Sequence, residues 1–164
     1  ENKIDLKDRL FSIAKKNKIK IYSLLLILII AIISIVLIND NKKKENIFLS
    51  KQYIKASIHL SSKEYDKAKK IYEEIITSKN KIYSILSLNS IIEKNLEEDV
   101  STILNYFDIL EKMSLSKESK DLLILKKALY LIKNSKIQEG NDLLNNLINN
   151  NSNLKSIIQE IQGN

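Results

Sequence analysis

The most apolar stretch of the chain runs from Ile21 to Ile38 and reads IYSLLLILIIAIISIVLI. It contains no charged residue, no glycine and no proline. As an α-helix it would be roughly 27 Å long, close to the hydrocarbon thickness of a bilayer. A helix that is apolar on every side needs a larger protein than this one to bury it, so a buried core helix is the weaker interpretation. The pattern therefore predicts a transmembrane anchor at residues 21–38.

Polar segments border this anchor. Residues 1–20 form a short basic tail, and residues 39–46, NDNKKKEN, form a juxtamembrane linker. Lysines on both sides suit the interface between lipid and water. The alternative is a cleaved signal peptide, but the charged region before the apolar core is long, and Ile38, Asn39 and Asp40 are not the small residues of a cleavage site. We expect an uncleaved signal anchor.

The tail itself leaves two interpretations open. Apolar residues between its charges predict either a brief amphipathic helix lying on the membrane or a disordered segment. They are Ile4, Leu6, Leu10, Phe11 and Ile13.

The net charge of +7 divides unevenly, with +4 in residues 1–20, +1 in residues 39–46 and +2 in residues 47–164. The excess therefore lies beside the anchor, where anionic lipid headgroups explain it. A nucleic-acid-binding domain would more often show an arginine-rich basic face, and this chain has the single arginine Arg9. Lysine and arginine are more frequent before the anchor than after it, which predicts a cytoplasmic tail and a domain on the far side of the membrane.

Residues 47–164 show the spacing of amphipathic helices. The chain has no proline, no cysteine and two glycines, so the turns of a compact β fold are scarce and an all-α fold is expected. Ser116 is placed to cap the fifth helix. The apolar stripes are Leu49, Tyr53, Ala56 and Leu60; Tyr65, Ala68, Tyr72, Ile75 and Ile76; Tyr83, Leu86, Ile91 and Ile92; Val100, Ile103, Leu104, Phe107 and Leu110; Leu122, Leu125, Leu129 and Ile132; Ile137, Leu143, Leu144, Leu147 and Ile148; and a final short helix over 154–161.

Two of these helix pairs match each other at a constant offset along the chain. Ala56 corresponds to Ala128, and Ala68 corresponds to Gly140. Small residues at these places would let two antiparallel helices approach closely. We therefore expect Ala68 to face Ala56, and Lys69, one residue on, to face away.

The segment KEYDKAKKIYEEII, residues 63–76, resembles the second helix of a tetratricopeptide repeat. Tyr65, Ala68 and Tyr72 follow the order aromatic, alanine, aromatic of that repeat. The Trp and the Leu-Gly pair of its first helix are missing here, and Ile75 stands where alanine is usual. The resemblance implies a tetratricopeptide-like array of helical hairpins over residues 47–164. A plain array of helical hairpins is the alternative.

A short tail, one anchor and a small domain of this kind together resemble the YfgM-type ancillary subunit of the bacterial Sec translocon. The resemblance covers most of the chain and rests on the order and length of its segments. It implies a single-pass protein of the bacterial inner membrane, with its C-terminal domain in the periplasm. Its partners would be the lipid bilayer, the SecYEG channel, the chaperone PpiD and translocating chains.

Residues for catalysis or cofactor binding are scarce. His59 is the only histidine, and we interpret it as a solvated side chain on a helix face. The acidic runs Glu73–Glu74 and Glu97–Glu98–Asp99 do not converge as an acid/base pair, because neighbouring helical residues point about 100° apart, and we interpret them as solvated faces. Gly140 and Gly163 are too isolated for a phosphate loop. We expect no enzyme, no metal, no cofactor, no small-molecule substrate and no nucleic-acid partner.

Two functional hypotheses remain. The first is a membrane-anchored protein-interaction module, a periplasmic chaperone-like factor at the Sec channel, whose stacked helices offer a face for protein partners. The second is a structural accessory subunit of a larger membrane complex. Exposed apolar patches on the domain would favour the second hypothesis. The sequence assigns no partner-binding residues to either.

Overall fold

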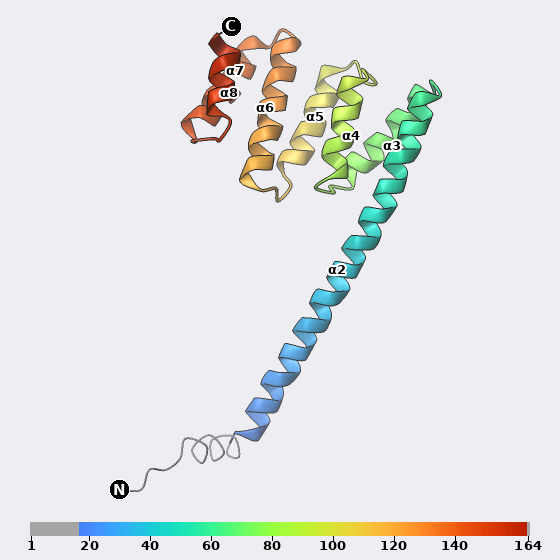
Figure 1. Cartoon of the computed structure of the whole chain (residues 1–164), viewed down its shortest axis with the longest axis vertical. Coiled ribbons are helices and arrows are strands. Elements are labelled where there is room, and N and C mark those ends of the chain that lie inside the picture. Colours follow the sequence, from blue (N-terminus) through green and yellow to red (C-terminus); the bar gives the residue numbers. More distant parts are fainter. Residues whose placement is uncertain (1–16, 164) are drawn as a thin grey trace. The chain divides into compact units, whose positions relative to one another are not determined.

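The computed structural model describes residues 17–163, and within them the chain is helical and contains no strand. Figure 1 shows the helices with the labels used below. They are α2 (Lys18–Ser61), α3 (Tyr65–Thr77), α4 (Tyr83–Glu93), α5 (Val100–Glu111), α6 (Lys117–Lys133), α7 (Ile137–Asn149) and α8 (Lys155–Gly163). The chain divides into two compact units, Glu1–Glu45 and Asn46–Asn164. The apolar residues of the predicted tail, from Ile4 to Ile13, lie outside the described residues.

The first unit consists, where described, of the N-terminal part of α2. Every side chain from Tyr22 to Ile38 is exposed. Ser23 and Ser34 donate their hydroxyls to the carbonyl oxygens of Lys20 and Ile30, both at 2.8 Å, so these two polar groups are satisfied within the helix. With a mean hydropathy of 3.2 over its most apolar window, α2 is long and apolar enough to cross a membrane, as judged by length and composition.

The segment predicted as a linker, residues 39–46, is helical and continues α2. Asp40 and Lys44 pair along this helix at 2.6 Å. The linker contains no glycine or proline, so nothing in its sequence ends the helix before Ser61.

The second unit is built from helix pairs joined by short turns. α2 and α3 are separated by three residues, and so are α6 and α7. The turn that ends α2 has a positive φ at Lys63, and the amide N–H of Glu64 donates to the carbonyl of His59. The equivalent bond recurs in the turn after α6, from the amide of Lys136 to the carbonyl of Leu131. Both turns are C-terminal caps in which a left-handed residue reverses the chain, so each pair runs antiparallel.

The close approach expected between the paired helices is confirmed for α6 and α7, and the burial of Ala56 and Ala68 agrees with it for α2 and α3. Ala56, Ala68 and Ala128 are all completely buried. A Cβ atom placed on Gly140 would lie 2.7 Å from the carbonyl oxygen of Ala128 and 2.5 Å from Cγ1 of Ile132. The backbones of α6 and α7 therefore approach so closely that a methyl group at Gly140 would not fit.

The core forms two clusters. The larger one joins the C-terminal half of α2 to α3, α4, α5 and the start of α6, and Tyr72, Ile75, Ile91, Ile103 and Phe107 lie in it. The smaller one joins α6, α7 and α8 around Leu144 and Ile158. In Figure 1, α4, α5 and α6 lie side by side.

Some predicted stripes are wrong in detail. The buried residues of α4 are Ser84, Ser87, Leu88 and Ile91, and those of α6 are Leu123, Leu125, Ala128 and Leu131. Leu86, Leu122, Leu129, Ile137 and Tyr65 are exposed instead. Both α4 and α6 have neighbours on two sides, so small residues take the closest contacts and some apolar residues remain on an open face. The other stripes and the Ser116 cap, which accepts from the amide of Ser119 at 3.3 Å, are confirmed.

Ala68→Leu should destabilise the second unit by about 1–3 kcal/mol, because three carbon atoms are added where α2 and α3 touch. Urea unfolding of a fragment covering residues 46–164 measures the change. Lys70→Leu is the matched control, since Lys70 is exposed on the same helix. Lys69 cannot serve, because it does not face away as predicted but pairs with Glu97 at 2.7 Å. Equal midpoints for the Ala68 and Lys70 variants would contradict the observed register.

Gly140→Ala should also destabilise the fragment. The added methyl group meets a backbone oxygen that cannot move away cheaply, and this clash outweighs the roughly 1 kcal/mol that alanine gains over glycine in a helix. At Gly163 a Cβ atom meets nothing within 4 Å, so Gly163→Ala should leave the urea midpoint unchanged or raise it. A Gly140 variant as stable as the Gly163 variant would refute the close contact of α6 and α7.

Candidate functional site

The acidic runs are only partly solvated. Glu74, Glu98 and Asp99 are exposed, as predicted. The carboxylate of Glu97 is only 13% exposed and pairs with the ammonium of Lys69, while Glu73 accepts a hydrogen bond from the hydroxyl of Tyr106 at 2.7 Å. The prediction of a solvated face is therefore wrong for Glu73 and Glu97. The connection between α4 and α5 folds back and brings Glu97 to Lys69 on α3.

Lys69, Glu73, Glu97 and Tyr106 form a polar cluster. It connects α3, α5 and the segment before α5. The hydrogen bond from Lys69 lowers the pKa of Glu97, and the same bond raises the pKa of Lys69. Burial, and then the hydrogen bond to Glu73, raises the pKa of Tyr106, so this phenol stays protonated and donates. Asp99 caps α5, and hydrogen bonds from Ser101 and Thr102 lower its pKa to about 2. These groups hold one another in place and leave no free base beside a nucleophile among the described residues.

His59 is not the solvated side chain that we expected. Its imidazole Nδ1 contacts the carboxylate of Glu64, which also accepts from Lys67 at 2.6 Å. Hydrogen bonds from Lys67 and then from His59 lower the pKa of Glu64. The imidazole therefore fastens the turn between α2 and α3. Within residues 17–163, no three histidine, cysteine or acidic side chains come together to hold a metal ion.

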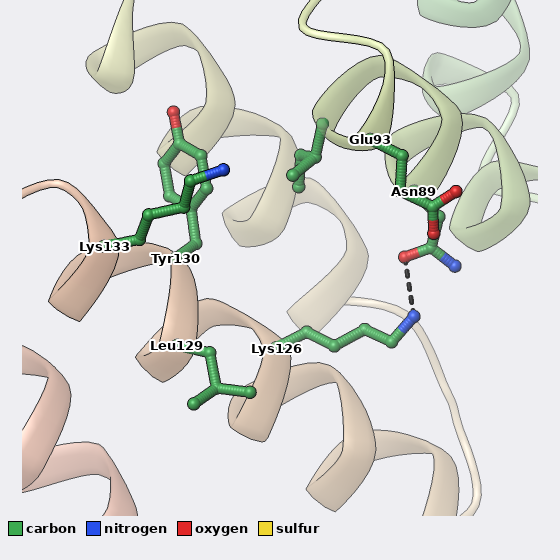
Figure 2. A pocket seen from close by; sticks show the side chains of 7 residues that line it. Asn89, Glu93, Lys126, Leu129, Tyr130 and Lys133 are labelled. Atoms are coloured by element: carbon green, nitrogen blue, oxygen red, sulfur yellow. Dashed lines mark hydrogen bonds between the residues drawn. The ribbon is translucent and has the colours of Figure 1, made fainter.

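An open pocket of about 230 Å³ lies between α4 and α6. Figure 2 shows side chains from both helices around it. They are Asn89, Ile92 and Glu93 of α4, and Lys126, Leu129, Tyr130 and Lys133 of α6. The ring of Tyr130 packs against Phe107 with a centroid distance of 6.1 Å, and burial raises the pKa of its hydroxyl. The walls are therefore apolar, with two ammonium groups and one carboxylate at the rim.

The surroundings of the Lys126 ammonium indicate what the pocket can bind. This ammonium donates to the amide oxygen of Asn89 at 2.8 Å and forms no ion pair with a carboxylate of the described residues (Figure 2). The adjacent Lys127 differs, because it contacts Asp108 at 2.7 Å and Glu111 at 2.9 Å. A half-buried ammonium with only a neutral partner can accept a carboxylate or a carbonyl oxygen from a bound molecule.

The pocket belongs to a longer open face. The turns that end α2, α4 and α6 share the same hydrogen bonds, which align Ile54 with Leu86 and Lys126, and Asn89 with Leu129. Ile54 is 55% exposed, and Leu86 and Leu129 are both 39% exposed. We call the surface formed by Leu86, Asn89, Glu93, Lys126, Leu129 and Lys133 the groove face. It can bury apolar side chains and pair with carboxylates.

Sequence reasoning missed the groove face. Leu86, Leu122 and Leu129 continue helical stripes that predict a core position, although they lie outside the core. The one available signal is the pair of buried serines Ser84 and Ser87, which mark the true inner side of α4. A predicted stripe that included Ser84 and Ser87 together with Leu88 and Ile91 would have placed the buried side of α4 correctly.

Lys69→Met should destabilise the 46–164 fragment at pH 7, because Glu97 loses its partner. The pKa of Glu97 is lowered in the fold, so its contribution is present above the ordinary value of 4.5 and is lost as pH falls through the lowered pKa. The difference between wild type and variant should therefore shrink as the pH falls below 4.5. Urea midpoints between pH 2 and pH 8 measure it, with Lys70→Met as the control. A difference that does not shrink with falling pH would show that the ion pair is not its source.

No model of a known protein family matches the chain, and no curated protein or solved structure matches it. The functional argument therefore rests on the geometry of the groove face and of α2.

Proposed function

We propose that the chain is a membrane-anchored protein-interaction module whose groove face binds segments of other proteins. The observation that carries this proposal is the open pocket between α4 and α6, with apolar walls and a half-buried ammonium that has no carboxylate partner among the described residues. Binding faces of proteins combine apolar area with a few oriented polar groups in this way. The bound segment would present an apolar side chain next to an acidic one.

The apolar part of α2 supports the anchor in this proposal. Its serine hydroxyls are satisfied within the helix, and its side chains from Tyr22 to Ile38 are exposed. A helix of this kind suits the hydrocarbon core of a bilayer, where polar groups must be satisfied within the protein. The larger number of lysine and arginine residues before the anchor supports a cytoplasmic N-terminus and a second unit on the far side of the membrane.

The helix pairs of the second unit support a tetratricopeptide-like array as part of the proposal. The turn at Lys63 and the turn at Ser135 repeat each other, and the interval between them equals two units of about 36 residues. The middle pair departs from this pattern, because a connection of six residues separates α4 from α5. That connection carries Glu97, which ties it to α3.

The narrower proposal is that of an accessory, chaperone-like factor beside the Sec translocation channel in a bacterial inner membrane, in the manner of YfgM-type subunits. It rests on the order of tail, anchor and helical array. Translocating chains emerge unfolded, and an apolar groove with cationic groups at its rim suits brief contact with such segments. The proposal contains no catalytic step.

A second function has an observation of its own. Large apolar side chains are exposed on α2, α4, α6 and α8, among them Ile58 at 60% and Ile157 at 51%. Such surfaces often contact neighbouring subunits permanently. A structural accessory subunit of one larger membrane complex is therefore the alternative.

Photo-crosslinking in native membranes tests these proposals. A photoreactive residue in place of Leu129 should yield adducts with several translocating chains and with Sec components. The same residue in place of Lys70, exposed on α3, should yield few. Lys126→Glu should reduce the Leu129 adducts about tenfold, because a carboxylate in the pocket repels an acidic segment.

Three results would change the proposals. Leu129 adducts as rare as those from Lys70 would reject the groove face as a binding site. A single stoichiometric partner other than the Sec channel would favour the structural subunit. Adducts with client chains that Lys126→Glu leaves unchanged would reject the acidic character of the bound segment.

A further inference from the structure

A second surface lies on α2, at the end of the helical array. In the last helix pair, α6 is preceded by the helix α5. No helix precedes α2 within the described part of the second unit, so α2 lacks the neighbour that α5 provides for α6. The repeated turns after α2 and α6 make the two helices comparable, position by position.

α6 uses three residues to hold α5. Leu123 is 2% exposed and lies in the same core cluster as Phe107 and Leu110 of α5. Lys127 pairs with Asp108 and Glu111, which stand three residues apart on α5. Tyr130 packs its ring on Phe107. An acidic, amphipathic helix is therefore the natural neighbour of this side of α6.

The corresponding residues of α2 are Lys51, Lys55 and Ile58, and all three are exposed. Lys55 stands where Lys127 stands in α6, yet neither Lys51 nor Lys55 pairs with a carboxylate of the described residues. Exposed apolar residues surround the two lysines. We call Ile47, Phe48, Lys51, Ile54, Lys55 and Ile58 the outer face of α2. These six residues lie within about one third of the helix circumference.

We propose that the outer face of α2 binds an acidic amphipathic helix of a partner protein, packed as α5 packs on α6. The four apolar residues supply the contact area. Lys51 and Lys55 supply positive charge without an acidic residue among them, so the partner must provide carboxylates. A spacing of three residues, as between Asp108 and Glu111, places two carboxylates on one side of the partner helix.

A second copy of the chain fits this face poorly. In a twofold pair the same surface meets itself, so the lysines of one copy would face those of the other. Like charges opposed in this way disfavour the pairing. A polyanion such as nucleic acid would leave Ile47, Phe48, Ile54 and Ile58 in water.

A peptide with the sequence of residues 99–112, which includes α5, is a defined probe. Its fluorescence anisotropy is measured with the full chain in lipid nanodiscs, with empty nanodiscs as the blank. The peptide should bind, and Lys55→Glu should weaken binding about tenfold or more, because an attraction becomes a repulsion. A peptide with Asp108→Asn and Glu111→Gln should bind the wild type more weakly than the acidic peptide does.

Matched controls separate this surface from the others. Lys70→Glu makes the same change of charge on α3, and Lys126→Glu makes it in the groove face. Lys70→Glu should bind the acidic peptide as the wild type does, and Lys55→Glu should weaken binding more than Lys126→Glu does. Helical circular dichroism of each variant shows that it is folded. A larger loss in Lys55→Glu than in Lys126→Glu separates the outer face of α2 from the groove face.

Several results would overturn the proposal. They are the absence of binding, equal affinity of wild type and Lys55→Glu, and equal binding of the acidic peptide and the peptide with Asp108→Asn and Glu111→Gln. A dimer of the full chain, seen by sedimentation and lost in Lys55→Glu, would replace the partner helix with a second copy. A larger loss of binding in Lys126→Glu than in Lys55→Glu would move the site to the groove face.

Discussion

The close contact between paired helices at small residues is the constraint on which the second unit depends. Ala56 and Ala68 are completely buried in one pair, and Gly140 in the other has no room for a methyl group beside Ala128. Helices that approach this closely bring their flanking large residues together, so Tyr72, Ile75, Leu144 and Leu147 are buried beside the contact. The same approach requires a tight reversal between the helices. Lys63 and Ser135 provide it at the cost of a left-handed backbone.

The sequence predicted the number and position of these helices well, because each carries its own apolar period and the small residues recur in the last pair as in the first. It predicted burial less well for α4 and α6. An apolar stripe indicates one buried side, whereas an inner helix of an array touches neighbours on two sides and leaves a third open. Ser84 illustrates the difficulty, since its hydroxyl donates to the carbonyl of Ile75 at 2.7 Å and is satisfied inside the core. The sequence offers Ser84 as a small residue that can be buried, but it does not show that the carbonyl of Ile75 accepts its hydrogen bond.

Charge was harder still to interpret from the sequence. The second unit is nearly neutral overall, yet adjacent lysines differ completely in their surroundings. Lys127 has two carboxylates within reach, and Lys126 has one neutral amide. In equivalent ion pairs of the two repeats, the acidic and the basic residue exchange positions. Glu64 pairs with Lys67 in the first turn, and Lys136 pairs with Glu139 in the corresponding one. The fold therefore determines where a pair forms, and the local residues determine which member is the acid.

The two ends of the array differ in a way that bears on function. At the C-terminal end, α8 follows α7 as α4 follows α3. The amide of Leu154 donates to Ser152 just as the amide of Ile82 donates to Asn80. Ile158 is completely buried, so α8 covers the apolar side of the last pair. Arrays of stacked helices need such covers to stay soluble. No helix in the described part of the second unit covers the corresponding side of α2, where exposed isoleucines alternate with lysines that have no acidic partner among those residues. The two ends of the described array therefore differ in surface, with buried Ile158 under α8 at one end and exposed isoleucines and lysines on α2 at the other.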